Sequence, residues 1–216
     1  VFRHNDTDHL EELMRRSKGR KIVITEGIFS MDGDMGKLSE IQSIAEHHDA
    51  ITVIDDAHGD FVFGPSFSGI PAKSGVNFDI HISSMSKGLG CFGGYVATTF
   101  SIRELLINTS RQFIYTSALP SHLCSAAITA IPIAKSGYRQ KRLEGNILHF
   151  SSTLKRLGFK LGNSASQIIP VIVGKEEQAL ELSKELLEEG VFAQAIRYPT
   201  VKKGHARLRI SLNATH

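Results

Sequence analysis

The sequence has no tryptophan and only two cysteines, Cys91 and Cys124, among its 216 residues. Two cysteines are too few for a disulfide framework or a cysteine-based metal site. No apolar run approaches the roughly 20 residues that cross a bilayer. The opening residues 1–6 are too polar for a signal peptide. We therefore expect a cytoplasmic protein in a reducing compartment, with no membrane partner.

The chain also lacks any block of like charges, although it carries 25 basic and 22 acidic residues and a formal net charge of +3. Such a mild excess is typical of solvated helix faces and argues against a nucleic-acid partner. The hydrophobic fraction of 41% is ordinary for a globular protein. The length suits one large domain, or one and a half.

Apolar patterning predicts an α/β fold. Compact β-branched runs predict buried strands, and apolar residues at helical spacing predict helices. Strands are expected at 21–25, 50–55, 80–84, 95–99, 113–116, 166–173, 191–196 and 207–212, and helices at 10–16, 38–48, 121–157 and 175–189. Their alternation predicts a mainly parallel sheet covered on both faces. We expect a large domain at 1–130 and a smaller α+β domain at 131–216.

Polar clusters follow several of the predicted strands. They are S-M-D-G-D at 30–34, D-D-A-H-G at 55–59 and S-S-M-S-K-G-L-G at 83–90. Ligands of open α/β sheets bind beyond the carboxyl ends of the strands. The convergence of these clusters predicts a site there.

Asp55 ends a predicted buried strand, where a carboxylate is costly unless it meets a cation. The protonated ring nitrogen of pyridoxal phosphate (PLP) is such a cation, and a paired carboxylate keeps it charged. An aspartate before a turn is, however, more often the N-cap of a helix. From chemistry alone both roles stay open.

Lys87 lies between serines and Gly88-Leu89-Gly90. A desolvated lysine has a lowered pKa and can bond to a carbonyl, although most lysines simply lie on the surface. Residues 88–93 also match G-x-G-x-x-G, the dinucleotide fingerprint. That motif requires a following helix, and a strand is predicted instead.

No metal site is expected. The pair Asp32 and Asp34 suggests a calcium loop, but Lys37 stands where such a loop requires glycine. The histidines lack ligand spacing with cysteines or acids.

Taken together, the motifs resemble those of the α-oxoamine synthases, a family of fold-type I PLP-dependent transferases. The likeness runs over essentially the whole chain. Beyond the three clusters it includes F-R-H-N-D at 2–6, G-G-Y at 93–95, T-S-A-L-P at 116–120 and R-L-R-I at 207–210. Members of the family extend further at both ends, so the resemblance implies that this chain is a fragment, without the N-terminal part and the C-terminal tail.

The resemblance implies a role for each matching position. Lys87 would hold PLP covalently, Asp55 would pair with the ring nitrogen of PLP, and His58 would form a hydrogen bond with its phenolic oxygen. Ser30 and Ser84 would line the cofactor site. Thr116 and Ser117 would reach the phosphate of a neighbouring subunit's cofactor, which implies a homodimer. Arg209 would bind the amino-acid carboxylate, although Arg207 lies on the same face of its strand.

The activity implied is the decarboxylating condensation of an amino acid with an acyl thioester. The run I-R-Y-P-T-V at 196–201 resembles that of members that join L-alanine to a pimeloyl thioester, carried by CoA or an acyl carrier protein, on the route to biotin. A glycine C-acetyltransferase using acetyl-CoA is the alternative. A non-catalytic partner subunit is another, but such partners typically lack the lysine that is present here as Lys87.

Overall fold

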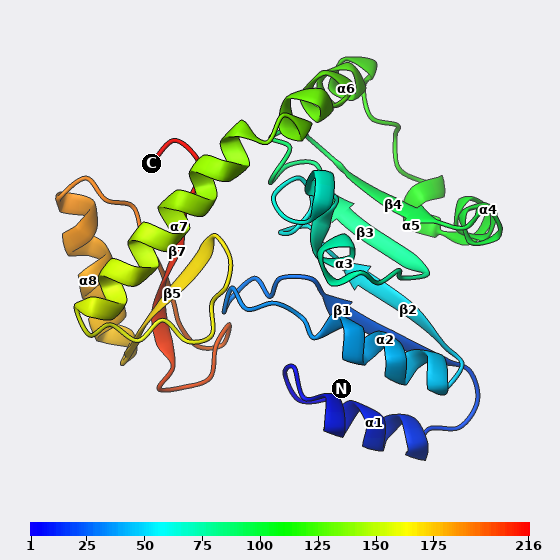
Figure 1. Ribbon diagram of the computed structural model, residues 1–216, viewed down its shortest axis with the longest axis horizontal. Coiled ribbons are helices and arrows are strands. Elements are labelled where there is room, and N and C mark those ends of the chain that lie inside the picture. The colour runs from blue at the N-terminus through cyan, green and yellow to red at the C-terminus, as the bar shows by residue number, and fades with distance from the viewer. The chain divides into compact units, whose positions relative to one another are not determined.

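The computed structural model describes residues 1–216, which form two compact units. The first contains residues 1–28 and 36–137, and the second contains residues 29–35 and 138–216 (Figure 1). The units meet in sequence at residues 137 and 138, a little beyond the boundary that the sequence analysis places after residue 130. No sequence feature assigned 29–35 to the second unit. None of the helices is both long and apolar enough to cross a membrane.

The first unit is built on a four-stranded sheet in the order β1-β2-β3-β4. Strands β1 to β3 are parallel, and β4 is antiparallel to β3, so the predicted mainly parallel sheet is confirmed. Its elements are α1 (Thr7–Arg16), β1 (Lys21–Glu26), α2 (Leu38–His47), β2 (Ala50–Asp55), η1 (Pro65–Phe67), α3 (Gly69–Ser74), β3 (Ile80–Ser84), β4 (Gly94–Thr98), α4 (Phe100–Thr109), α5 (Arg111–Ile114) and α6 (Ser121–Lys135).

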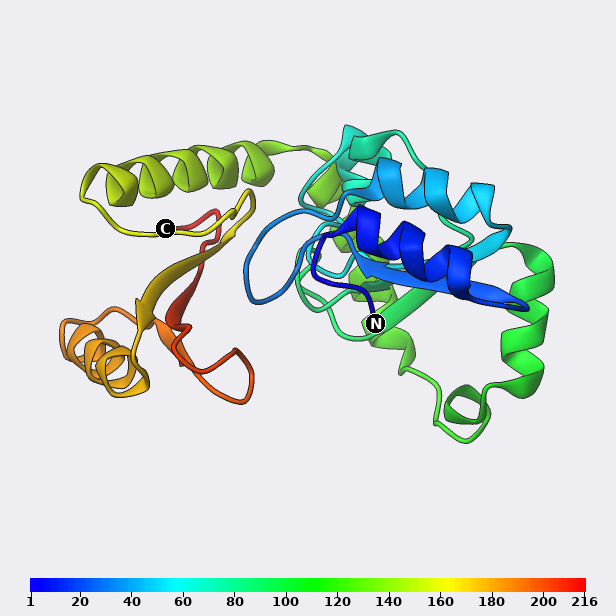
Figure 2. The ribbon, with the colours of Figure 1, turned by 90° about the horizontal axis from the view of Figure 1, so that it is seen from below.

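Helices α1 and α2 lie along one face of this sheet (Figure 2). Leu10 and Met14 of α1, Ile41 of α2 and Val23 of β1 form the buried cluster beneath them. Side chains alternate between the faces of a strand, and on the other face Ile22 and Ile24 are 61% and 66% exposed. The expected cover on both faces is therefore wrong for β1, because both neighbouring helices lie on the same face.

The strand predicted at 113–116 is also wrong, because the chain forms the short helix α5 there. Its backbone groups bond locally, from Ile114 N to Ser110 O at 2.9 Å and from Tyr115 N to Arg111 O at 3.0 Å. Phe113 and Tyr115 are 64% and 78% exposed, so no sheet buries them. A short apolar run does not by itself distinguish a strand from a helix turn.

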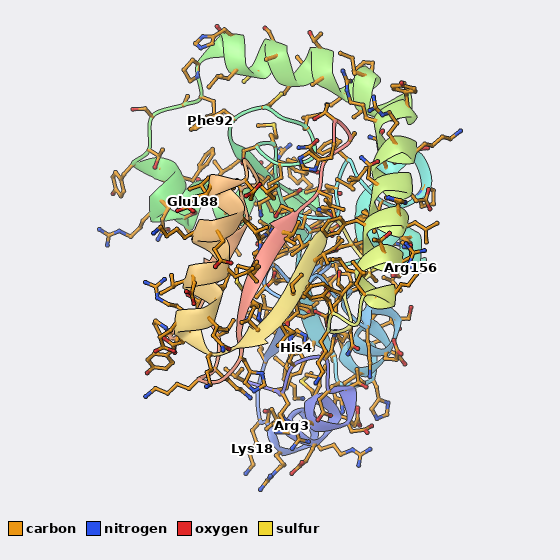
Figure 3. All side chains as sticks on the ribbon, turned by 90° about the vertical axis from the view of Figure 1, so that its left-hand side faces the viewer. Arg3, His4, Lys18, Phe92, Arg156 and Glu188 are labelled. Carbon is orange, nitrogen blue, oxygen red and sulfur yellow. The ribbon has the colours of Figure 1, made fainter.

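The second unit pairs an antiparallel sheet, in the order β5-β7-β6, with two helices. Its elements are α7 (Tyr138–Arg156), β5 (Ile168–Gly174), α8 (Glu176–Glu188), β6 (Gln194–Ile196) and β7 (Ala206–Ser211). Ile169, Ala179 and Leu208 lie at the centre of its core. Charged side chains on the helices, such as Arg156 and Glu188, extend into solvent (Figure 3).

The segment 29–35 joins the second unit by backbone packing. Gly33 has a φ of +68°, and a Cβ at this position would overlap Ile168 O at the start of β5. Ala165 N donates to Gly33 O at 3.1 Å. Only glycine suits both the positive φ and this close approach.

Candidate active site

Two of the predicted polar clusters leave the sheet side by side. Residues 56–59 follow β2 and residues 85–93 follow β3. Asp55, the last residue of β2, is paired with Ile82 in the parallel register of these strands. The carboxyl ends of neighbouring parallel strands meet at one edge of a sheet. The sheet therefore brings the aspartate cluster and the lysine cluster together, as the sequence predicts.

Lys87 and His58 are in direct contact across this edge. Lys87 Nζ lies 3.0 Å from His58 Nε2. The side chain of Lys87 is exposed, yet it is hydrogen-bonded rather than extended into solvent. An amine and an imidazole at this distance can exchange a proton directly.

The loop that carries Lys87 is closed by its own backbone. Met85 N donates to Gly93 O at 2.9 Å, and Cys91 N donates to Met85 O at 2.7 Å. Strand β4 follows the loop directly. A dinucleotide fingerprint needs a helix at this position, so residues 88–93 do not form one.

Asp55 is exposed at the end of β2, which differs from the buried carboxylate expected there. Its Oδ1 accepts a hydrogen bond from Ala57 N at 3.0 Å, which forms a local Asx turn. The N-cap alternative is not realised, because residues 57–59 form a turn and no helix begins. Only one carboxylate oxygen is used in this turn, and the exposed side chain can meet a cationic ligand.

Asp56 is the buried carboxylate of the pair, with no exposed surface. Its Oδ2 accepts from Ile70 N at 2.7 Å, and its Oδ1 has no hydrogen-bond partner. Burial raises the pKa of this carboxyl from 3.8 to about 7, with a smaller contribution from the charge of Asp60. Cβ atoms at three glycines that surround the carboxyl would overlap it, namely Gly27, Gly59 and Gly69.

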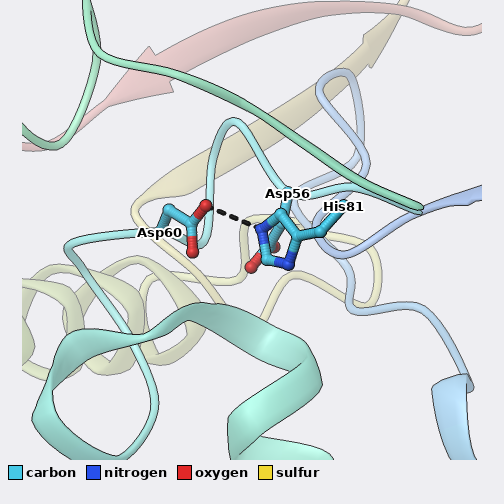
Figure 4. Close-up of side chains that lie close together, drawn as sticks. All are labelled: Asp56, Asp60 and His81. Atoms are coloured by element: carbon cyan, nitrogen blue, oxygen red, sulfur yellow. Dashed lines mark hydrogen bonds and ion pairs between the residues drawn. The ribbon is translucent and has the colours of Figure 1, made fainter. Parts of the chain in front are cut away.

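Asp60 is likewise buried, and it is held by two donors on neighbouring strands. Its Oδ2 lies 2.8 Å from His81 Nε2 on β3 (Figure 4). The same oxygen accepts from Tyr95 OH on β4 at 2.7 Å. Burial opposes the ionisation of Asp60, yet these hydrogen bonds hold the pKa of its carboxyl below its usual range. Burial also opposes the charging of His81, but Asp60 raises the pKa of the imidazole. The two groups form an ion pair when the His81 imidazole is protonated.

Asp56, Asp60 and His81 offer atoms within 4.8 Å of one another, close enough for a cation to be considered. The Oδ2 atom of Asp60 is already occupied by the His81 and Tyr95 donors. The raised pKa of Asp56 also keeps its carboxyl protonated below about pH 7, whereas a metal ligand must be deprotonated. Within the cluster Asp60 Oδ2 and Asp56 Oδ2 are hydrogen-bonded, whereas Asp56 Oδ1 is buried without a partner. Sequence reasoning missed Asp60 and His81, because nothing in their spacing marks them, and it gave Asp56 no role of its own within the D-D-A-H-G cluster.

Of the other candidates in the first unit, Ser84 lies beside the Lys87 loop, whereas Thr116 and Ser117 do not. Ser84 ends β3, and its Oγ lies 2.7 Å from Ser86 Oγ, so both hydroxyls belong to the lysine loop. Thr116 donates its hydroxyl to Gln112 O within its own helical turn, and Ser117 follows exposed. The structure does not bring Thr116 or Ser117 into contact with Lys87.

Ser30 and Arg209 are joined within the second unit, where Arg209 Nε donates to Ser30 O at 2.6 Å. Burial lowers the pKa of the half-buried Arg209 guanidinium. Arg207 is more deeply buried and forms an ion pair with Asp32. The two arginines therefore differ, since Arg207 already has a carboxylate partner and Arg209 has neutral oxygens.

Comparisons with known proteins found similarity over essentially the whole chain. The family model described as aminotransferase class I and II matches residues 2–216. The 8-amino-7-oxononanoate synthases of Thermoanaerobacter pseudethanolicus and Pelobacter propionicus are 43% and 40% identical to the whole of this chain, which covers 56% and 57% of their lengths. The chain thus spans little more than half of these relatives.

Solved structures show the same fold. The serine palmitoyltransferase of Sphingomonas wittichii has a TM-score of 0.95 and 32% identity, over 100% of this chain and 56% of its own. A structure of SPT with PLP as an internal aldimine has a TM-score of 0.94 and 31% identity, with coverage of 100% and 56%. The 8-amino-7-oxononanoate synthase of Francisella tularensis has a TM-score of 0.86 and 26% identity, with coverage of 100% and 63%.

Proposed function

The chain belongs to the aminotransferase class I and II family, whose model matches residues 2–216. We propose that it is the part of a PLP-dependent C-acyltransferase that contains the cofactor-binding lysine, Lys87. The fold of the matched structures confirms the predicted fold-type I architecture and the resemblance to the α-oxoamine synthases. The observation that supports the proposal most directly is the contact of Lys87 Nζ with His58 Nε2 at 3.0 Å, beside the strand that ends in Asp55.

The side chains at this edge suit PLP in their chemistry. Lys87 offers an amine for the aldehyde carbon, and Asp55 offers an exposed carboxylate for the ring nitrogen. His58 offers an imidazole for the phenolic oxygen, and Ser84 offers a hydroxyl nearby. When bound, PLP supplies an electron sink for the carbanion chemistry of an amino acid.

Thr116 and Ser117 would serve the cofactor phosphate of a second subunit. In this chain neither Thr116 nor the exposed Ser117 contacts Lys87. We therefore propose that they act on the cofactor of the second subunit in a homodimer. The cytoplasmic location stays a prediction from the sequence.

The chemical roles follow from the atoms available. Lys87 Nζ takes the α-proton of the amino acid and later returns a proton, with His58 Nε2 holding the amine in place through the 3.0 Å contact. The Asp55 carboxylate would pair with the ring nitrogen and thereby favour the protonated ring. The α-carbon that Lys87 deprotonates would attack the carbonyl carbon of the acyl thioester, forming a C–C bond as the thiolate leaves. The resulting β-keto acid would lose carbon dioxide, and a proton returned by Lys87 would take the place of the lost carboxyl group.

Arg209 is the proposed binder of the amino-acid carboxylate. Its guanidinium bonds Ser30 O and Ser211 Oγ, which are neutral acceptors. A half-buried guanidinium without an anionic partner gains from binding a carboxylate. Arg207 is already neutralised by Asp32.

L-alanine and a pimeloyl thioester, on CoA or an acyl carrier protein, are the proposed substrates, with 8-amino-7-oxononanoate as product. The names of the curated relatives support this choice. Glycine with acetyl-CoA remains the alternative pair. A non-catalytic partner subunit is disfavoured by the presence of Lys87 in contact with His58.

Spectroscopy with purified protein and PLP tests the proposal. We expect an absorption band near the visible that Lys87→Ala abolishes and that the exposed-site control Lys18→Ala retains. L-alanine should shift the band at lower concentration than glycine does. A band that survives Lys87→Ala would reject the proposed role of this lysine, and a stronger response to glycine would favour the acetyl transfer reaction.

A further inference from the structure

The turn that carries His58 is fastened to the sheet at both ends. At its beginning Asp56 N donates to Ile82 O of β3 at 2.9 Å. At its end the Asp60 carboxylate receives His81 of β3 and Tyr95 of β4 at 2.8 and 2.7 Å. Between them, Gly59 N and Asp60 N both donate to Asp56 O, at 2.9 and 3.0 Å. The position of His58 therefore depends on these two anchors.

The Lys87 loop rests on the same turn. A Cβ atom at Gly88 would lie only 2.5 Å from Asp60 O and 2.9 Å from a methyl carbon of Val62. The glycine after Lys87 is therefore packed directly on the backbone of Asp60. A shift of that backbone would move Lys87 as well as His58.

Asp60 is held in place by charge as well as by hydrogen bonding. Asp60 is 4% exposed, its pKa is held low, and that of His81 is raised by their contact, so a charge-assisted hydrogen bond links the turn to β3. The Tyr95 hydroxyl adds a second donor, and the Tyr95 ring lies nearly parallel to that of His81, at 14°. Buried and paired on two strands, this carboxylate has little freedom to move.

From these contacts we infer that Asp60, held by His81 and Tyr95, is a positioning residue that sets the contact between Lys87 and His58. This inference rests on the proposed function of Lys87. Asp60 is buried and its carboxylate is occupied by His81 and Tyr95, so we do not assign it a direct contact with the cofactor. It acts through the backbone on which Gly88 lies and through the turn that contains His58.

Two variants test the inference at different strengths. Tyr95→Phe removes one donor and keeps the ring, and we expect PLP to bind Lys87 about fivefold more weakly, the loss typical of one hydrogen bond. Asp60→Asn removes the charge that both donors address, and we expect a loss of tenfold or more. Ile41→Val, a cavity-forming change in the core beneath α2 and away from this turn, serves as a control for lowered stability, with PLP affinity unchanged.

A second readout needs no cofactor. In the protein without PLP, the ¹⁵N signal of His58 Nε2 reports its contact with Lys87, and it should shift in Tyr95→Phe and not in Ile41→Val. If Tyr95→Phe and Asp60→Asn keep the wild-type His58 signal and PLP affinity, the positioning role is refuted. If the unmodified protein binds no PLP at Lys87, the proposed function fails, while the His58 signal still decides whether Asp60 sets the contact.

Discussion

Replacing Asp56 with asparagine should change how the stability of the protein depends on pH. Burial raises the pKa of the Asp56 carboxyl from 3.8 to about 7 in the folded protein. The unfolded chain releases the same proton near pH 4. Between these values the folded state holds a proton that the unfolded state has lost, so the free energy of unfolding falls as the pH rises, and it levels off above about pH 7.

The size of the effect follows from the pKa shift. One pKa unit corresponds to about 1.4 kcal/mol, so the contribution of Asp56 declines by at most about 4 kcal/mol between about pH 4 and about pH 7. Asparagine has nearly the shape of a protonated aspartic acid and does not titrate. Its side-chain oxygen can still accept the Ile70 N–H that Asp56 Oδ2 accepts at 2.7 Å.

Urea unfolding followed by circular dichroism, at several values from about pH 5 to about pH 8, measures the difference. Relative to the wild type, Asp56→Asn should gain up to about 3 kcal/mol between about pH 5 and about pH 7. Glu181→Gln, the same change at an exposed acid, should run parallel to the wild type. A constant difference between Asp56→Asn and wild type would refute the buried, protonated state.

Two further changes separate packing from function. Gly33→Ala should lower the free energy of unfolding by roughly 3 kcal/mol, because its Cβ would overlap Ile168 O. Gly19 also has a positive φ but lies in open space, so Gly19→Ala should lower it by only about 1 kcal/mol. Equal losses for the two variants in urea unfolding would contradict the contact of Gly33 with Ile168. Arg209→Lys should raise the KM for the amino acid about tenfold with stability retained, whereas Arg207→Lys should mainly lower stability. Steady-state kinetics and thermal unfolding of both variants test this assignment. A raised KM in Arg207→Lys together with lowered stability in Arg209→Lys would contradict it.

Local sequence patterns predicted much of the fold. The β-branched runs that form β1 and β2 are recognisable because they are compact and continuous. Residues 113–116 were misassigned because the same residue types suit an exposed helical turn. The incorporation of 29–35 into the second unit depends on packing of Gly33 against β5, which no pattern in its neighbours reveals.

The candidate site was partly predictable. Motif order led to Lys87, His58 and Asp55, and the structure brings the first two into contact. The burial of Asp56 in place of Asp55 could not be predicted, since adjacent aspartates are equivalent in a sequence pattern. The partners of Asp60 were also missed, because they lie on two other strands and only the sheet register unites them.

The central claim is that Lys87 is the residue that bonds to PLP. Borohydride reduction of the protein with PLP, followed by peptide mass spectrometry, tests it by fixing the cofactor where it is bound. The account predicts a pyridoxyl group on the peptide that contains Lys87, at a yield far above that on the exposed Lys18. A label that is absent from Lys87, or spread evenly over the surface lysines, would contradict it.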